Sequence, residues 1–402
     1  MDARAVIGAG YGDEGKGLLV DALAWEAPGA VVVRTNGGAQ AGHTVTTPDG
    51  RRHVFHHLGS GALAGASTHL SRAFVSAPML FGAEQDRVAA LGGRIEVGAD
   101  PRGPVTTPWD VALNQAAEVA RADGRHGSCG IGFGETVGRD FLPAFALAVG
   151  DLCGPGLRAR LRAIRDAWLP RRLAELGLDL DILGPEAAEA IRGDAVLDRF
   201  LRDCHDFLAR VRVRPDADLG RLGPVIFEGA QGLLLDQVRG AFPHVTRSNT
   251  GIANMARVAR EAGIGGIAAH YVSRAYVTRH GAGPLAGEGP VPFDVVDPTN
   301  APNPWQGTVR TAPLDLGILA AAVAADLGDA DGLRVAPALV LTCLDQARGD
   351  VPCRDGGASR SLDPAGALGA AAERVGIPAG AGAWGPTRAT LRFEPGSGRM
   401  AA

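Results

Sequence analysis

Three side chains near the start of the chain could act on a phosphate group or on a proton: Asp13, Lys16 and His43. Lys16 stands in the spacing Gly10-x-x-x-x-Gly15-Lys16, which is typical of the first part of a nucleotide-binding phosphate loop. A lysine there can neutralise phosphate oxygens, and the carboxylate of Asp13 can ligate Mg²⁺ or act as a general base. His43 is an acid/base candidate because the unperturbed pKa of histidine lies near neutrality. These residue types predict phosphate binding with acid/base chemistry beside it.

The phosphate loop departs from the usual pattern at its last position. Gly17 stands where a serine or threonine would hold magnesium, and an acid, Asp13, lies inside the loop instead. Residues 4–7 form a short apolar run, and Leu18 begins a helical apolar pattern. A strand, a glycine turn and a helix together direct backbone N–H groups at a phosphate. This context favours phosphate binding over a merely solvated turn.

Further polar loops follow other predicted strands. Residues 228–232 could form part of a site or only a tight turn into a helix, and residues 245–250 could cradle phosphate or cap a helix. Asp345 could read the edge of a guanine base or cap a helix. Glycine-rich loops also occupy residues 36–44 and 124–134. Because ligands of open α/β sheets bind at the carboxyl ends of the strands, we expect one composite site built from many loops.

The alternation of strand and helix patterns predicts an α/β protein with a mostly parallel central sheet flanked by helices. Between about residues 155 and 211 the apolar spacing is helical. No linker composition bounds this segment, so we expect a helical insert within one domain that covers residues 1–402. The other expected elements are strands at residues 30–34, 268–279 and 336–341, a strand and loop at 224–232, helices at 108–122 and 314–327, and a polar hairpin at 48–58 that turns at Pro48–Gly50.

Composition narrows the classes of partner. The 402-residue chain has a net charge of -4 and a pI of about 6.2, so no general electrostatic attraction to nucleic acid or anionic membranes is expected. No apolar run is long enough to span a bilayer, and the N-terminus does not resemble a signal peptide. The five cysteines are scattered and form no CxxC pair, which predicts reduced thiols in a cytoplasmic protein rather than disulfides or a zinc site.

Taken together, these motifs closely resemble those of the adenylosuccinate synthetase family. The first loop has the family's Gly-Asp-Glu-Gly-Lys-Gly form, and the matching segments follow in unbroken order from about residue 5 to residue 393. The resemblance implies the adenylosuccinate synthetase fold. The matching segments are Gly12–Gly17, Ala41–Thr44, Gly130–Gly132, Phe227–Gly232, Leu234–Asp236, Pro243–Thr250, Ala275–Pro284, and Gly385, Pro386 and Arg388 near the C-terminus.

The resemblance implies a Mg²⁺- and GTP-dependent ligase that joins IMP and aspartate into adenylosuccinate and releases GDP and phosphate. Asp13 would remove the N1 proton of the purine, so that the 6-oxygen attacks the γ-phosphate. His43 would donate a proton or a hydrogen bond to that transfer, while Lys16 and Mg²⁺ spread the developing charge. The amine of aspartate would then displace phosphate. Asp13 and the Gly42 carbonyl would hold Mg²⁺, and Gln231 would lie at the reacting purine oxygen.

The same resemblance assigns the binding residues. Thr246 would contact the 5′-phosphate, and Arg139 would reach across the interface of a homodimer to the neighbour's nucleotide. The residues expected at the phosphate donor are Gly12, Glu14, Gly15, Gly17, Thr44, Asp345 and Gly385, and those expected at the purine nucleotide are Gln40, Ala41, Ser128, Arg139, Thr246, Asn249 and Arg310.

Departures from the family's pattern gather at the recognition positions, whereas the residues that carry the chemistry are retained. Retention of Asp13, Lys16 and His43 favours an active enzyme. We keep open an ordinary adenylosuccinate synthetase and a paralogue in specialised or modified-nucleotide metabolism that uses another amine, another nucleotide or ATP. A non-catalytic nucleotide-binding regulator is the least favoured alternative. The departures are residues 126–129, Arg247 in place of a serine, residues 306–315 with Arg310 as their only arginine, Cys343 in place of a lysine, and Trp384.

Overall fold

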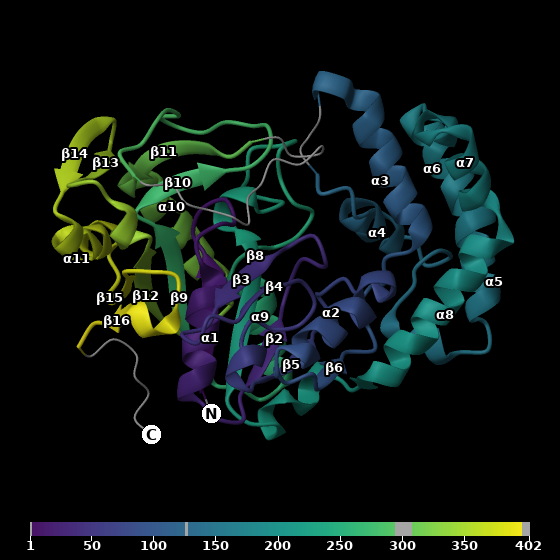
Figure 1. Ribbon diagram of the computed structural model, residues 1–402, viewed down its shortest axis with the longest axis horizontal. Coiled ribbons are helices and arrows are strands. Elements are labelled where there is room, and N and C mark those ends of the chain that lie inside the picture. Colours follow the sequence, from purple (N-terminus) through teal and green to yellow (C-terminus); the bar gives the residue numbers. More distant parts are fainter. Residues whose placement is uncertain (1, 125–127, 294–307, 396–402) are drawn as a thin grey trace.

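A ten-stranded sheet forms the centre of the computed structural model, which describes residues 2–124, 128–293 and 308–395 (Figure 1). Every neighbouring pair of its strands is parallel except β15 and β16. The predicted mostly parallel sheet is thus confirmed. In spatial order the strands are β16 (Leu391–Phe393), β15 (Ala379–Ala383), β12 (Arg334–Thr342), β9 (Gly266–Arg274), β1 (Asp2–Gly8), β8 (Val225–Gly232), β2 (Val31–Arg34), β5 (Ser67–Leu70), β6 (Val97–Ala99) and β7 (Val211–Val213).

Helices cover both faces of the central strands, which explains why these strands are apolar throughout rather than alternating. In β1, Val6 packs in an apolar cluster with Val20 of α1 (Lys16–Glu26), whereas Ile7 packs in another with Met255 of α9 (Ile252–Glu261). The helices α10 (Leu316–Leu327) and α11 (Pro364–Val375) extend the second cluster. The carboxyl ends of β1 and β8 are therefore held rigidly beside each other.

The helical insert expected at residues 155–211 is present, and Figure 1 shows its helices on the side of the molecule away from α11 and β14. One apolar cluster joins it to the neighbouring helices. Thr107 and Asp110 form a capping box that fixes the start of the preceding helix, α3. The helices of this region are α2 (Pro78–Ala90), α3 (Pro108–Arg121), α4 (Phe133–Asp140), α5 (Leu157–Ala163), α6 (Leu169–Leu176), α7 (Pro185–Arg192) and α8 (Asp194–Arg210).

The two smaller sheets and the start of α10 show where the boundaries of the strands and helices differ from those predicted. The strand expected at residues 268–279 divides after β9, because β10 (Tyr276–Arg279) joins a second sheet with β11 (Arg310–Asp315), β13 (Val351–Asp355) and β14 (Ala358–Leu362). The helix expected from Leu314 begins instead at Leu316, since Asp315 caps it. The expected turn at Pro48–Gly50 is present, but the hairpin starts before the predicted residues 48–58, because its first strand is β3 (His43–Thr46), which pairs with β4 (Arg52–Phe55).

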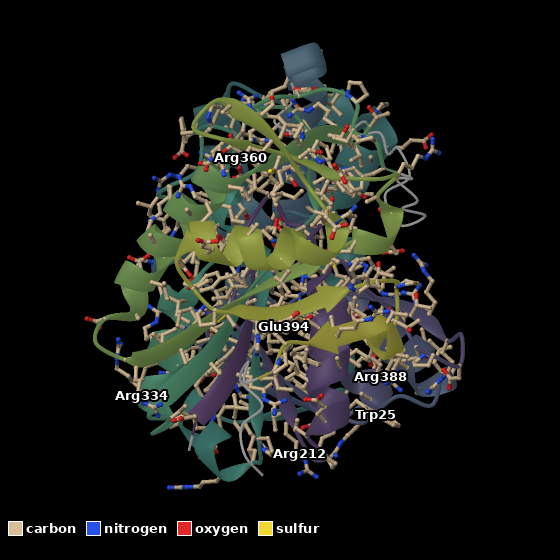
Figure 2. All side chains as sticks on the ribbon, turned by 90° about the vertical axis from the view of Figure 1, so that its left-hand side faces the viewer. Trp25, Arg212, Arg334, Arg360, Arg388 and Glu394 are labelled. Carbon is tan, nitrogen blue, oxygen red and sulfur yellow. The ribbon has the colours of Figure 1, made fainter. Side chains whose placement is uncertain are left out.

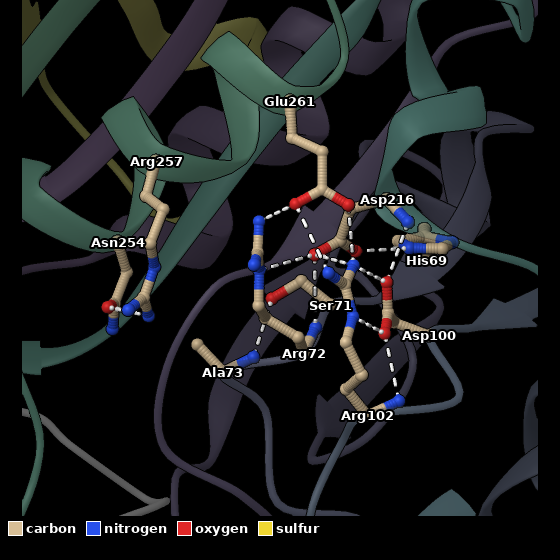
Figure 3. Close-up of polar contacts among 10 residues, drawn as sticks. All are labelled: His69, Ser71, Arg72, Ala73, Asp100, Arg102, Asp216, Asn254, Arg257 and Glu261. Carbon is tan, nitrogen blue, oxygen red and sulfur yellow. Dashed lines mark hydrogen bonds and ion pairs between the residues drawn. The ribbon is translucent and has the colours of Figure 1, made fainter. Parts of the chain in front are cut away.

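A cluster of ion pairs fastens the region between β6 and β7 to the central layer (Figure 3). Asp100 follows β6 and Asp216 follows β7, and both carboxylates are fully buried. Arg102 binds Asp100 and Glu261 at 2.6 Å, and Arg72 binds Asp216 at 3.4 Å as well as Glu261. Glu261 ends α9, so the cluster ties the segments that follow β6 and β7 to this helix.

All five cysteines are free thiols, as predicted. None of the helices described here combines the length and the apolar character needed to cross a bilayer. The expectation of one domain over residues 1–402 stays a prediction.

Candidate active site

The phosphate loop folds around an internal ion pair. The buried carboxylate of Glu14 accepts hydrogen bonds from the backbone N–H groups of Gly10 at 2.9 Å and Gly12 at 2.7 Å. The ammonium of Lys16 donates to Glu14 and to the Gly12 carbonyl, both at 2.7 Å. Glu14 thus shapes the loop through internal contacts. Of the three N–H donors of Lys16, one has no partner among the described residues and can meet a phosphate oxygen.

The structure gives a steric reason for the missing hydroxyl at Gly17. A β-carbon added there would lie 2.7 Å from the carbonyl oxygen of Thr44, because the backbone of β3 packs against the first turn of α1. No serine or threonine fits without displacing the hairpin. The close approach also places His43, the neighbour of Thr44, beside the phosphate loop. Gly15, with φ of 87°, provides the left-handed turn into α1.

Asp13 contacts Arg274, the last residue of β9, and the imidazole of His280, which directly follows β10. Its carboxylate lies 2.8 Å from Nε2 of His280, and its backbone carbonyl accepts a hydrogen bond from Arg274. Burial works to raise the pKa of Asp13, but the contact with His280 and the charges of Arg274 and Lys16 outweigh it and hold the pKa below its usual value. Asp13 is therefore an ionised carboxylate at neutral pH, as a metal ligand or a general base must be.

His43 forms the second histidine–carboxylate pair of the site. Its Nδ1 lies 2.5 Å from Glu228, which also accepts a hydrogen bond from the backbone of Ser60 at 3.0 Å. Burial lowers the pKa of His43 to about 4. Burial also opposes ionisation of Glu228, but the charge of Arg34 and the contacts with His43 and Ser60 lower its pKa to about 2. The pair is thus a carboxylate with a neutral imidazole that donates through Nδ1.

This tautomer leaves Nε2 of His43 as an acceptor. Nε2 is buried, and it has no hydrogen-bond partner in the part of the chain that the structure describes. His43 becomes a donor only when protonated, and a phosphoryl anion beside it would raise its pKa toward that state. The sequence allowed residues 228–232 to be either a tight turn or part of a site. In the structure they include Glu228, the partner of His43.

The remaining loops gather at the same edge of the sheet. Gln231 has a left-handed φ of 63°, and its side-chain oxygen would lie 3.2 Å from a β-carbon on Gly12. Both amide atoms of Gln40 are buried without a partner among the described residues. Cys129 donates to the Gln40 carbonyl at 3.6 Å, and Ser128 accepts from Asn114 at 2.9 Å. An unpartnered buried amide and a strained glutamine mark this edge as a binding site.

Other predicted residues lie in the loops around this edge. Ala41 is buried, whereas Gly42 is exposed and leaves its backbone open to a ligand. Thr246 and Asn249 are half-buried in the loop after η7 (Leu233–Leu235), which Asp236 holds by accepting from the backbone of Thr250 at 2.9 Å.

Two predicted arginines point elsewhere. Arg139 is fully buried, binds Asp110 at 2.9 Å, and uses its other N–H groups on backbone carbonyls of its own chain. No part of its side chain is exposed in this single chain, and its expected contact with a neighbour's nucleotide stays a prediction. Arg310 binds Glu288 at 2.8 Å and the carbonyls of Gly281 and Gly283. Its expected contact with the purine nucleotide stays a prediction.

The positions predicted to face a guanine base follow β12 and β15. Asp345 is exposed after β12, and Cys343 before it has a left-handed φ of 61°. Gly385 follows Trp384, whose ring lies under Arg392 at 5.4 Å. Arg388 and Trp25 lie together in Figure 2, with the Arg388 guanidinium 4.2 Å above the ring and 2.8 Å from Asp21 of α1. Residues 126, 127, 306 and 307 of the predicted recognition loops lie outside the described residues.

Sequence reasoning missed His280 and Arg274, the two partners of Asp13. His280 fills the variable position of the segment Ala275–Pro284, so the motif itself gave no signal for it. The available signal was its place in a glycine-rich loop directly after a buried strand, where a polar residue usually faces a ligand.

Comparisons with known proteins agree with this geometry. The sequence pattern named adenylosuccinate synthetase matches residues 5–298. The adenylosuccinate synthetase of Anaeromyxobacter sp. (strain K) is 36% identical over 300 residues, 72% of this chain and 65% of that protein. The enzyme of Neisseria gonorrhoeae is 35% identical over 296 residues, 70% and 64% of the two chains. The match thus spans slightly less than two thirds of these relatives' length.

Two solved structures share the fold at low sequence identity. The fully ligated adenylosuccinate synthetase of Plasmodium falciparum superposes with a TM-score of 0.72 at 16% identity, over 98% of this chain and 100% of that chain. The succinoaminodeoxyadenylate synthetase of cyanophage S-2L, bound to dGMP and to dATP as an energy donor, gives 0.61 at 19% identity over 98% and 95%. At these identities the likeness concerns the fold alone.

Proposed function

The chain belongs to the adenylosuccinate synthetase family, and on that premise we propose that it is a nucleoside-triphosphate-dependent ligase acting in purine synthesis. The γ-phosphoryl group of the donor is transferred to the 6-oxygen of an IMP-like nucleotide. An amine, that of aspartate in the family, then forms a bond to C6 while the C6–O bond breaks and phosphate leaves. The products are adenylosuccinate or an analogue, a nucleoside diphosphate and phosphate.

The observation that carries this proposal is the convergence of an ionised Asp13 and the His43–Glu228 pair on the phosphate loop of Lys16. Asp13 takes the N1 proton, which makes the 6-oxygen a nucleophile. His43 meets the transferred phosphoryl group through Nε2, and the charge of Lys16 stabilises the developing negative charge. The amide of Gln231, beside Gly12, orients the purine oxygen.

We propose Mg²⁺ as the cofactor, held by the carboxylate of Asp13 and the carbonyl of the exposed Gly42. The described residues contain no group of three or more acidic, histidine or cysteine side chains that could hold a metal by themselves. This donor set fits Mg²⁺, which usually takes one or two carboxylates together with substrate phosphates. When bound, Mg²⁺ supplies positive charge to the transferred phosphoryl group.

The first candidate function uses GTP as the phosphate donor, with Asp345 facing the guanine base. A second candidate is a paralogue that uses ATP or a different nucleotide or amine. The observation in its favour is that the family's lysine is replaced by Cys343, held in a left-handed backbone, and that Trp384 fills space near Gly382. The cyanophage synthetase with the same fold binds dATP as its energy donor.

We also propose a homodimer in a reducing compartment such as the cytoplasm. The dimer rests on the resemblance to the family, in which a homodimer is expected. The five free thiols support the compartment. Sedimentation of the active protein as a strict monomer would contradict the dimer.

One assay tests the function: phosphate release from a matrix of GTP and ATP, purine monophosphates, and amino acids. Turnover with IMP, GTP and aspartate supports the first candidate and excludes the second, a paralogue with other substrates. Turnover only with another triphosphate, nucleotide or amine supports the second. Nucleotide binding by calorimetry without phosphate release in any combination would overturn the enzyme and indicate a regulator.

A further inference from the structure

Arg247 connects two loops of the candidate site. It lies in the loop that carries Thr246 and Asn249, and its Nη1 donates to the carbonyl of Gly134 at 3.1 Å. Gly134 lies in the first turn of α4, just after the loop that carries Ser128. The side chain of Arg247 therefore links the two segments that are expected to contact the purine nucleotide.

Arg247 packs against a face of α4 that is formed by two glycines. Gly134 and Gly138 are four residues apart, so they lie on the same face of the helix. A β-carbon on Gly138 would lie 3.0 Å from Nη1 of Arg247, and one on Gly134 would lie 3.7 Å from its Cδ. A glycine inside a helix costs about 1 kcal/mol relative to alanine. Two in an eight-residue helix indicate that the bare face serves the contact with Arg247.

Three other arginines near the candidate site are each paired with a carboxylate. Arg139 is neutralised by Asp110, Arg310 by Glu288 and Arg239 by Asp329. Arg247 is exposed and has no carboxylate within ion-pair distance in the described ranges. There its only hydrogen-bond acceptor is the Gly134 carbonyl, which leaves most of its five N–H donors for a ligand.

We propose that Arg247 recognises the 5′-phosphate of the purine nucleotide, because its guanidinium is accessible whereas that of Arg139 is buried against Asp110 in this structure. This rests on the proposed function and on the expectation that Ser128 and Thr246 contact the purine nucleotide. The planar guanidinium donates to phosphate oxygens in a bidentate manner, which a serine cannot do. Arg247 thereby determines specificity for a nucleoside monophosphate over the nucleoside.

The test is calorimetric binding of IMP and inosine, together with KM for IMP and for the triphosphate. Arg247→Ser should raise the Kd and KM of IMP about 10- to 100-fold, as expected for a charged hydrogen bond. The KM of the triphosphate should stay within about twofold. Arg247→Lys, which keeps the charge and loses the planar fork, should lie between serine and wild type.

Two further variants separate recognition from folding. Gly138→Leu adds a side chain where Nη1 of Arg247 lies, so it should weaken IMP binding without removing the arginine, while favouring the helix. Arg257→Ser is the matched control, because Arg257 is an exposed arginine of α9 whose side chain bonds Asn254. It should leave both Kd values unchanged.

Equal weakening of IMP and inosine by Arg247→Ser would overturn the proposal, as would an unchanged Kd for IMP or a wild-type protein that does not bind IMP. If no substrate set releases phosphate but Arg247→Ser still weakens IMP selectively, the ligase function fails and the role of Arg247 stands. Selective loss of affinity for the triphosphate instead would assign Arg247 to the donor and overturn its role at the 5′-phosphate.

Discussion

The site contains two histidine–carboxylate pairs that differ chiefly in burial. In the pair His43–Glu228 both side chains are at most 4% exposed, whereas in the pair His280–Asp13 the exposed fractions are 19% and 24%. The partly exposed pair carries the carboxylate that we propose as base and metal ligand, and the buried pair carries the imidazole that meets the phosphoryl group.

Burial sets what each pair can do. Around His43, low polarity keeps the imidazole neutral and Glu228 fixes its tautomer, so the orientation of Nε2 is built into the fold. Asp13 is partly accessible to ligands, and the contact with His280 together with the charges of Arg274 and Lys16 keeps it ionised despite its partial burial. A rigid buried pair can orient a group, and an accessible pair can exchange protons and hold a metal.

Breaking the accessible pair should have the largest effect. Asp13→Asn keeps the size of the side chain but cannot accept the N1 proton, so kcat should fall about 10²–10⁴-fold, the usual contribution of general acid–base catalysis. Stopped-flow measurement of phosphate release checks this, and thermal unfolding shows whether the fold is intact. A folded variant that retains more than a tenth of wild-type kcat would refute the role of Asp13.

Breaking the buried pair should have a smaller, more specific effect. Glu228→Gln removes the charge that raises the pKa of His43, so the pKa of His43 should fall. The limb of the rate–pH profile that reports His43 beside the phosphoryl anion, which raises its pKa, should move to lower pH. We expect kcat to decrease about 10- to 100-fold, near the low end of acid–base contributions. The profile of kcat from pH 4 to pH 9 measures both changes.

Ser60→Ala is the matched control for this experiment. It removes one hydrogen bond to Glu228 but keeps the contact with His43, so the profile should shift little. If Glu228→Gln and Ser60→Ala shift the profile alike, the pair with His43 does not govern the reaction.

From the sequence it was possible to predict those residues of the two histidine–carboxylate pairs that belong to a local motif. The spacing around Lys16 identified the phosphate loop and Asp13. The alternation of strand and helix patterns along the chain predicted a mostly parallel sheet, whose strands end at one edge. The partners could not be predicted in this way. His43 and Glu228 are 185 residues apart, and only the placement of the β3 hairpin beside β8 joins them. Nothing local showed that Arg139 would be buried against Asp110.

A third histidine, His270, is buried like His43 but lacks a carboxylate, so it isolates the effect of burial. It lies in β9 and is 3% exposed, and neither ring nitrogen has a hydrogen-bond partner among the described residues. Burial, with a smaller contribution from the charge of Arg4, lowers its pKa from 6.5 to about 4. Below pH 6.5 the unfolded chain therefore binds a proton that the folded chain excludes, and stability falls until the pH reaches about 4.

His270→Leu should reduce this acid sensitivity, the smallest of the effects predicted. Removing the group should shrink the loss of unfolding free energy between pH 7 and pH 5 by about 2 kcal/mol, the amount that such a pKa difference contributes over that range. Urea unfolding at the two pH values measures it. His205→Leu, at an exposed histidine of α8, is the matched control for the same substitution. An unchanged slope in His270→Leu would mean that burial alone does not exclude the proton, and that the neutrality of His43 depends on its charged neighbours Arg34 and Lys16 instead.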